Sequence, residues 1–545
     1  MSEFNETVVH DVIIIGSGPC GLAVASRLCE PSPSALFTDD EHQRYHWIKK
    51  YGRRMTLKNR KNGRILEKRN PCEARRYSTL VLDATGNQWM NRWKTLFTAF
   101  DIQHLRSPMF WHVDPSDRDA LLAMAHNEGV EGELFELKNC VGKEVSKHLR
   151  RARAKGRNPR HHAIVDIDER DRKDYFTPPT SLFLDHCKSI ADRYHLCGDD
   201  IVRHEAVQDI DYRVVEEVPS DDELFVVRTD KGHTHYARVV VLAAGPGNKP
   251  RIPCIPGLVD GQGLVPPQVC HSMQIREFPG SVVQDRIVAR KTTNILMIGG
   301  GLTSAQLSDL AIRRGVTKVW HLMRGPCKVK LFDVDLSWMG KFRNVEQAYF
   351  WGADSDAERL QHILRARNGG SMTPMYHKKL KKHVETGRLE LREHTCVSSA
   401  SFDTEKGVWH VQTEPPIPEM PAFDFVYFAT GIQSDFFTLP YLKTLLARHP
   451  IDGHGGLPCI TEDLMWDKDL PFFVTGRFAG LQLGPAAGNL GGARVGAERI
   501  AWAIEDLLPG RTPGDEGGED TDEELHYVTG RGNRFRSLSV AGEDG

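Results

Sequence analysis

The sequence predicts a three-layer α/β fold in which two parallel sheets are each built from strand–helix–strand units. Two observations carry this prediction: a G-x-G-x-x-G motif directly follows an apolar β-branched run at residues 12–15, and a second glycine-rich turn follows a similar run at residues 294–298. In agreement with them, later strand-like runs end in small-residue turns and return the chain to each sheet. Together they indicate two Rossmann-like dinucleotide-binding domains with β-meanders, the second domain inserted in the first.

The first glycine motif has the strand–turn–helix context that a dinucleotide fingerprint requires. Gly16 forms the tight turn, Gly18 lets the backbone approach a pyrophosphate, and Gly21 lets the helix pack on the strand. Cys20 is interpreted as a small packing residue of the turn rather than a reactive thiol. The predicted dinucleotide contacts of this turn are Gly16, Ser17, Gly18, Pro19, Cys20 and Gly21.

An acid that follows the fingerprint by about 20 residues usually holds a ribose hydroxyl. Residues 34–40 are predicted to form a short strand that ends in Asp39 and Asp40. Asp39 is the first candidate for the ribose contact and Asp40 the second. For either residue, an acidic N-cap of the next segment is the alternative.

Composition excludes several classes of function. The chain has 545 residues, with 71 Lys and Arg against 73 Asp and Glu, so its charge does not indicate nucleic-acid binding. No apolar stretch approaches the roughly 20 residues of a membrane span, and residues 1–10 resemble no signal peptide. The eleven cysteines form no C-x-x-C pair, and no H-E-x-x-H occurs, so no metal site is predicted. We expect a cytoplasmic protein with no nucleic-acid or membrane partner.

The middle of the chain is predicted to return to the first sheet. Residues 41–80 form a basic insertion, and residues 90–200 mix helices with aromatic loops. A helix is predicted within residues 175–194 and a β-meander over residues 206–242. The meander ends in a turn whose predicted dinucleotide contacts are Ala243, Ala244 and Gly245.

The second module differs from the first at the end of its second strand. That strand, at residues 318–323, ends in Arg324 rather than in an acid. An arginine there accommodates the 2′-phosphate of NADP, so this module is predicted to bind NADPH; a surface arginine is the alternative. A helical insert occupies residues 328–382. The predicted NADPH contacts are Gly299, Gly301, Leu302, Thr303, Ser304, Arg324, Ala429, Thr430 and Gly431.

The last signal is a strand at residues 472–475 followed by a small-residue helix start. Such a helix N-terminus stabilises negative charge, as on the pyrimidine ring of a reduced flavin. The predicted FAD contacts here are Gly476, Gly488, Asn489 and Leu490. The predicted domains are an FAD-binding domain over 1–288 and 433–508, an NADPH-binding domain over 289–432, and a disordered tail over 509–545.

Two such modules suit the transfer of a hydride from nicotinamide to flavin. A disulfide reductase would need a cysteine pair beside the flavin, and the sequence has none at useful spacing. A monooxygenase needs a desolvated pocket in which reduced flavin meets O2, which favours that activity.

The motifs also carry a resemblance. The chain resembles the class B flavin monooxygenases, in particular the ornithine and lysine N-hydroxylases, and is most similar to the oxidative stress-induced growth inhibitor-like proteins, many of them fungal. The matching segments are GSGPCG from Gly16, LRSPMFWHVDP from Leu105, AAGPGNKPRIP from Ala243, GGGLTSA from Gly299, ATGI from Ala429, and residues 476–498.

The resemblance also has departures. The fingerprint FxGxxxHxxxW is missing around His271, where Val265, Pro267 and Ile275 replace its other positions, so Baeyer–Villiger chemistry is not indicated. His271 and Ser272 are interpreted as a loop that satisfies its own hydrogen bonds. By the resemblance, the flavin or the substrate pocket is lined by Arg106, Ser107, Phe110 and His112, with structural packing as the alternative.

The resemblance therefore implies an FAD-containing, NADPH-dependent monooxygenase of specialised metabolism. It would hydroxylate a small-molecule substrate at a nitrogen or an activated carbon, with O2, through a C4a-peroxyflavin. Two alternatives stay open: an NADPH oxidase or reductase, and a regulatory stress-response flavoprotein with little turnover.

Overall fold

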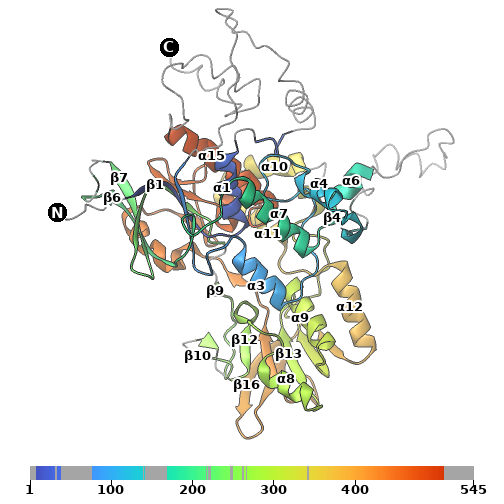
Figure 1. Ribbon diagram of the computed structural model, residues 1–545. Helices are drawn as coiled ribbons and strands as arrows, with labels where there is room; N and C mark the ends of the chain where they lie inside the picture. Colours follow the sequence, from blue (N-terminus) through green and yellow to red (C-terminus); the bar gives the residue numbers. More distant parts are fainter. Residues whose placement is uncertain are drawn as a thin grey trace, which may run out of the picture.

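The computed structural model describes residues 8–30, 33–37, 77–138, 140, 169–216, 218, 222–245, 249–260, 263–264, 267–339 and 343–508. Its two main sheets lie in an upper and a lower lobe (Figure 1). The predicted pair of α/β modules is therefore confirmed. Most of the predicted basic insertion and the whole predicted tail, residues 509–545, lie outside the described residues.

The upper sheet is built around β1, which carries the apolar run of the first fingerprint. Residues 12–15 are at most 5% exposed, because the strand has parallel neighbours on both sides and its side chains belong to the hydrophobic core of this lobe. β6 and β7 pair antiparallel beside β8, which confirms the predicted meander. In spatial order the sheet contains β22 (Met465–Asp467), β23 (Leu470–Val474), β8 (Thr234–Leu242), β1 (Val9–Ile15), β2 (Thr79–Asp83) and β5 (Val202–His204), with β6 (Val207–Val214) and β7 (Glu223–Thr229) beside them.

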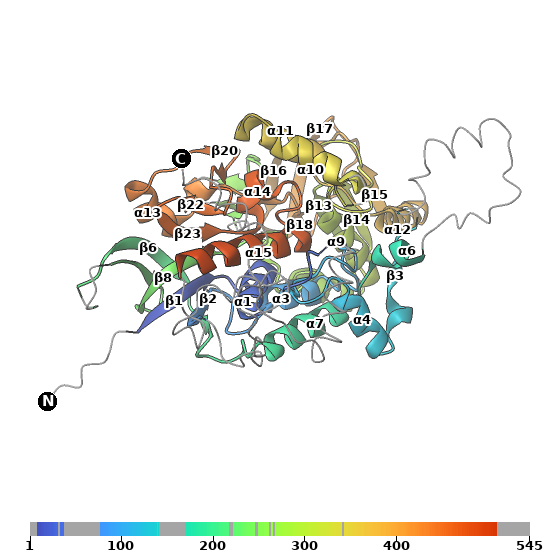
Figure 2. The same ribbon diagram turned by 90° about the horizontal axis from the view of Figure 1, so that it is seen from above.

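Helices α1 and α15 pack against each other along this sheet (Figure 2). A buried ion pair joins them, with Arg27 Nε 2.7 Å from Glu498 Oε2. The helix predicted within residues 175–194 is confirmed as α7. The helices of this lobe are α1 (Pro19–Cys29), α3 (Asn91–Ala99), α4 (Ala120–Asn127), α6 (Glu169–Asp174), α7 (Thr180–Arg193), α13 (Lys443–Arg448), α14 (Gly480–Leu483) and α15 (Leu490–Leu507).

The lower sheet has five parallel strands. Its edge strand β12 lies before residue 289, so this lobe takes up chain that the sequence assigned to the first domain. Helix α8 also packs on its core, through Val283. In spatial order the sheet contains β12 (Val269–His271), β18 (Phe425–Phe428), β13 (Asn294–Ile298), β14 (Lys318–Leu322) and β15 (Leu389–Arg392), and its helices include α8 (Ser281–Val288) and α9 (Leu302–Arg313).

The predicted helical insert joins the two lobes. Phe332, Phe350 and Ile363 belong to the core of the upper lobe, whereas Tyr376 and Leu380 belong to the core of the lower lobe. The insert therefore fixes one lobe against the other. Its helices are α10 (Arg343–Trp351), α11 (Asp356–Arg367) and α12 (Pro374–Glu385).

No helix among the described residues is both long and apolar enough to span a membrane. Further strands outside the two main sheets complete the structure. The remaining strands are β3 (Phe135–Glu136), β4 (Phe176–Thr177), β9 (Lys249–Pro250), β10 (Val259–Asp260), β11 (Gly263–Leu264), β16 (Cys396–Asp403), β17 (Val408–Glu414), β19 (Ile432–Gln433), β20 (Gly453–His454) and β21 (Leu457–Pro458).

Candidate functional site

One large cavity, of about 1290 Å³, lies between the two lobes. Both glycine fingerprints and the start of α15 line it, because the carboxyl ends of β1 and β13 face each other there. Ligands of open parallel sheets bind at this end of the strands. The cavity is therefore the candidate functional site.

The first fingerprint turn adopts the geometry that its glycines predict. Gly16 has φ +112°, and a Cβ there would lie 2.6 Å from the carbonyl oxygen of Ala243. A Cβ on Gly21 would lie 2.0 Å from the carbonyl oxygen of Gly16, so Gly21 supports helix–strand packing rather than lining the cavity. Gly18 is extended, and a Cβ there would meet no atom within 4 Å. Of the six predicted residues, the cavity is lined by Gly16, Ser17, Gly18, Pro19 and Cys20.

The prediction of a strand at the start of residues 34–40 is wrong. Residues 34–37 form a turn, in which the Phe37 amide donates to the Ser34 carbonyl at 3.0 Å. Asp39 and Asp40 lie outside the described residues. The strand that pairs with β1 is instead β2, far later in the chain, and it ends in Asp83. The prediction expected the second strand directly after α1, whereas a long segment separates α1 from β2 in the sequence.

Asp83 occupies the position at which an acid holds a ribose in this type of module. Its Oδ2 accepts hydrogen bonds from the Ser17 amide at 2.7 Å and the Ser17 hydroxyl at 2.9 Å, and Asp83 lines the cavity. The sequence held a signal for it: residues 80–82 are an apolar run that an acid follows directly, like an ordinary second strand.

The other predicted contacts of the first module also line the cavity. These are Ala243, Ala244 and Gly245 after β8, Gly476 after β23, and Gly488, Asn489 and Leu490 at the start of α15. No side chain caps the N-terminus of α1 or of α15. Their first amide groups and the positive end of the helix dipole are thus available to an anion.

The second fingerprint repeats this geometry. Gly299 has φ +153°, and a Cβ there would lie 2.3 Å from the carbonyl oxygen of Ala429. His321 on β14 donates from Nε2 to the Gly299 carbonyl at 2.7 Å, and burial lowers the pKa of His321 to about 4. The imidazole therefore stays neutral and holds the turn. Helix α9 also starts without a side-chain cap, at Gly301.

Eight of the nine predicted contacts of this module line the cavity: Gly299, Gly301, Leu302, Thr303, Arg324, Ala429, Thr430 and Gly431. Ser304 does not, because its hydroxyl turns back and donates to the Gly301 carbonyl at 2.8 Å. Arg324 is exposed at the end of β14, as its position in the sequence indicated.

Solved structures with the same arrangement exist. The reduced form of ornithine hydroxylase from Pseudomonas aeruginosa matches with a TM-score of 0.57 and 17% identity, over 92% of this chain and 99% of that one. Ornithine N-hydroxylase from Kutzneria sp. 744, with reduced FAD, NADP+ and L-ornithine, gives 0.57 and 16%, over 92% and 100%. The FAD-bound cadaverine monooxygenase of desferrioxamine biosynthesis from Erwinia amylovora gives 0.54 and 12%, over 94% and 100%.

The chain has the fold of the N-hydroxylating flavin monooxygenases. No protein-family model matches its sequence, and the search of curated proteins found no match. The likeness is therefore one of fold rather than of sequence, and it covers nearly the whole chain.

Within this N-hydroxylase fold, only one of the four predicted pocket residues of the 105–115 loop lines the cavity, namely Ser107. Arg106 instead joins the lobes: its guanidinium donates to the carbonyls of Lys330 at 3.0 Å and Phe332 at 2.9 Å, and to the Ser371 hydroxyl at 2.9 Å. Arg106 thus holds the insert in place. Its hydrogen-bond acceptors are largely backbone carbonyls, which a sequence pattern cannot reveal.

Phe110 and His112 belong to the same loop, and both side chains are buried. Phe110 packs edge-on against Trp111 and Tyr175. The His112 ring is hydrogen-bonded through Nε2 to the Arg118 carbonyl at 2.7 Å, and burial holds the pKa of His112 well below its ordinary value. Packing, the alternative interpretation of these two residues, describes what they do in the structure.

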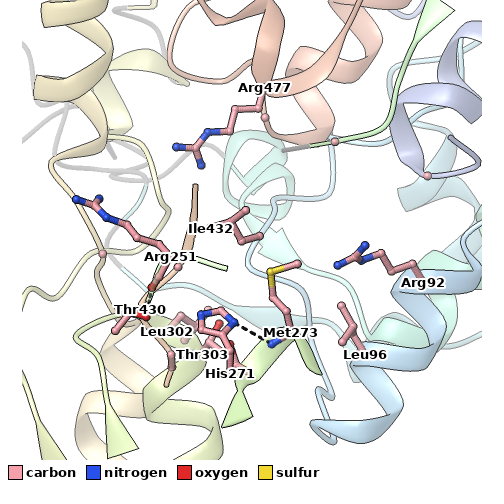
Figure 3. Close-up of a pocket in the computed structure, with 18 of the residues that line it drawn as sticks. Arg92, Leu96, Arg251, His271, Met273, Leu302, Thr303, Thr430, Ile432 and Arg477 are labelled. Carbon is pink, nitrogen blue, oxygen red and sulfur yellow. Dashed lines mark hydrogen bonds between the residues drawn. The ribbon is translucent and has the colours of Figure 1, made fainter. Parts of the chain in front are cut away.

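Several cavity residues of this fold were not anticipated. Arg92 and Leu96 come from α3, Met273 from the turn after β12, and Arg477 from the turn after β23 (Figure 3). Burial, followed by the nearby charge of Arg367, lowers the pKa of Arg477. Among the described residues no carboxylate pairs with Arg477, so its charge is available to a ligand. These residues follow no fingerprint, and only the packing of the lobes assembles them.

His271 also lines the cavity, with its side chain buried. The His271 amide donates to Gln274 Oε1 at 2.9 Å, and His271 Nδ1 accepts from the Met273 amide at 3.3 Å. The interpretation of this segment as a loop that satisfies its own hydrogen bonds therefore holds for the amide and Nδ1 of His271, but not for its buried Nε2, which has no hydrogen-bond partner among the described residues. Burial lowers the pKa of His271 to about 4, so the ring is neutral at physiological pH.

Proposed function

We propose that this chain is an FAD-containing, NADPH-dependent monooxygenase that uses O2 to oxidise a nitrogen or an activated carbon of a small-molecule substrate in specialised metabolism. The observation that carries the proposal is that two glycine-rich dinucleotide turns open onto one cavity. A protein that needed only one dinucleotide would have no use for the second turn. The Kutzneria structure, which holds reduced FAD, NADP+ and an amine substrate together, has the same fold.

The first module fits FAD. Gly18 leaves open space where a pyrophosphate would approach, the uncapped start of α1 offers amide donors, and Asp83 offers a carboxylate to a ribose. Asn489 and Leu490 open α15 toward the same cavity, with Arg477 beside Gly488. Positive charge at this end would stabilise a reduced, anionic flavin.

The second module fits NADPH. Gly301 is extended, and the nearest atom to a Cβ there would be the Gly370 Cα at 4.0 Å, so this turn is also open to a pyrophosphate. Arg324 lies at the strand end where a 2′-phosphate is recognised. The wall of the cavity carries the cations Arg92, Arg251, Arg324, Lys328, Arg367 and Arg477, against the acids Asp83 and Glu205. This excess of positive charge suits two polyanionic cofactors.

Bound flavin would accept a hydride from NADPH and activate O2. The residues of this chain would bind both cofactors, orient them across the cavity and exclude water from between them. Arg106 maintains that geometry at a distance, since it ties the insert to the upper lobe. We also propose a cytoplasmic location, which the ten free cysteines among the described residues favour, because thiols stay reduced there.

Anaerobic stopped-flow absorbance tests the proposal. NADPH should bleach the flavin of the purified protein quickly, and oxygenated buffer should then produce a lasting transient that differs from both the oxidised and the reduced spectra. Immediate reoxidation with stoichiometric release of H2O2 would instead establish an NADPH oxidase. A protein that binds no flavin, or whose flavin NADPH does not reduce, would refute the proposal and favour a regulatory role.

A further inference from the structure

Three potential metal ligands meet at the edge of the cavity, where Glu205 belongs to its wall. Glu205 follows β5, and His233 and His235 lie where β8 begins, 28 and 30 positions later in the chain. Glu205 Oε1 is 3.0 Å from His233 Nδ1, and Glu205 Oε2 is 2.9 Å from His235 Nε2. All three ligand atoms lie within 4.8 Å of one another.

The spacing of these atoms suits a single ion. First-row divalent ions bind imidazole nitrogen and carboxylate oxygen at about 2.0–2.2 Å. At those bond lengths, two ligand atoms are about 3.0 Å apart around an octahedral ion and about 3.4 Å apart around a tetrahedral one, so three ligand atoms within 4.8 Å of one another can reach a single ion after small side-chain rotations. The two histidines are two residues apart in an extended segment, so their side chains leave the backbone on the same side.

The surroundings also suit an ion. Glu205 and His235 are 4% and 8% exposed, whereas His233 is 56% exposed and gives an ion and water access from solvent. The Thr229 hydroxyl donates to Glu205 Oε2 at 2.8 Å and fixes the carboxylate, as outer groups do at metal sites.

We propose that Glu205, His233 and His235 bind one divalent first-row transition-metal ion, such as Zn2+, with water in the remaining positions. The two-histidine, one-carboxylate donor set is of the kind that such ions prefer. The ion would tie the β7–β8 hairpin to the end of β5, directly before Ala206 and Val207, which line the cavity. The sequence indicated no metal site because Glu205 stands 28 and 30 positions before the two histidines, and only the fold brings the three together.

The test is a Co2+ titration of the chelator-treated, full-length protein, followed by visible absorbance. The wild type should bind one ion per chain, and Zn2+ should displace it. His233→Ala removes an exposed ligand and should weaken Co2+ binding at least tenfold. His410→Ala is the matched control: His410 is 54% exposed and lies 3.9 Å from the Asp403 carboxylate, but no third ligand from the described part of the chain joins them. It should bind Co2+ like the wild type.

Thermal unfolding gives a second measurement that does not depend on the flavin. Zn2+ should raise the Tm of the wild type and of His410→Ala, but not that of His233→Ala, because only an intact site binds the folded state selectively. Absence of saturable one-to-one binding in the wild type, or equal Co2+ affinity in His233→Ala, would overturn the proposal. The three side chains would then form a hydrogen-bonded cluster alone.

Discussion

A methyl group added at Gly18 should separate cofactor binding from folding. Gly18 has φ −77° and ψ −172°, which any residue adopts, and its Cβ would meet no protein atom within 4 Å. Gly18→Ala should therefore change the Tm of the flavin-free protein very little. The methyl group would, however, project into the cavity where the proposed pyrophosphate lies. Overpacking of a close contact costs about 1–3 kcal/mol, so the Kd for FAD should rise about five- to 150-fold.

Two sister variants serve as controls. In Gly21→Ala, the Cβ would lie 2.0 Å from the carbonyl oxygen of Gly16, inside the helix–strand contact, so this variant should lose stability with or without FAD. In Gly301→Ala, the methyl group would enter the second turn, 4.0 Å from the Gly370 Cα. That variant should bind NADPH more weakly and FAD normally.

The assay is fluorescence titration of the apoprotein with FAD and, separately, of the holoprotein with NADP+, with Tm measured for each variant. We expect Gly18→Ala to weaken the binding of FAD alone and Gly301→Ala to weaken the binding of NADP+ alone. If Gly18→Ala bound FAD as tightly as the wild type, the first turn would not hold the pyrophosphate. Equal loss of both cofactors in both variants would also refute the assignment of one cofactor to each module.

Three further outcomes are expected. Arg324→Ala should raise the Kd for NADPH about tenfold or more and leave the Kd for NADH unchanged, because a charge-assisted contact contributes about 1.5–3 kcal/mol. The control Arg392→Ala changes an arginine at the end of the next strand, outside the cavity wall, and should leave the Kd for NADPH unchanged. Equal use of NADPH and NADH by the wild type would contradict this role of Arg324. Arg477→Gln should lower the flavin midpoint potential by about 20–40 mV, equivalent to about 1–2 kcal/mol, whereas Arg499→Gln, on the far part of α15, should leave the potential unchanged in spectroelectrochemistry. Burial keeps the pKa of His321 near 4 in the folded state, against about 6.5 when unfolded. Between these pKa values the unfolded chain binds a proton at His321 and the folded chain does not, so the free energy of unfolding should fall by about 1.4 kcal/mol per pH unit as pH decreases from about 6.5 to 4. In urea unfolding, His321→Gln should show a shallower pH dependence of this free energy. Equal pH dependence in the variant and the wild type would contradict the role given to His321.

The sequence by itself determined the two dinucleotide modules. Their glycines are local requirements: Gly16 and Gly299 need positive φ and a close backbone approach, and those needs appear directly as short motifs beside apolar strands. The meander before Ala243 and the small-residue start of α15 were visible for the same reason, since periodicity and residue size act over a few neighbouring positions.

Tertiary structure decided which distant residues join those modules. Asp83 lies beside Ser17 because β2, and not the segment just after α1, pairs with β1. Arg106 was predicted to line the pocket, yet it donates to carbonyls of the insert, and backbone acceptors leave no trace in the sequence. Glu205 meets two histidines only because the fold brings the start of β8 to the residue that follows β5. Contacts between elements depend on how strands are ordered in a sheet, which local patterns do not specify.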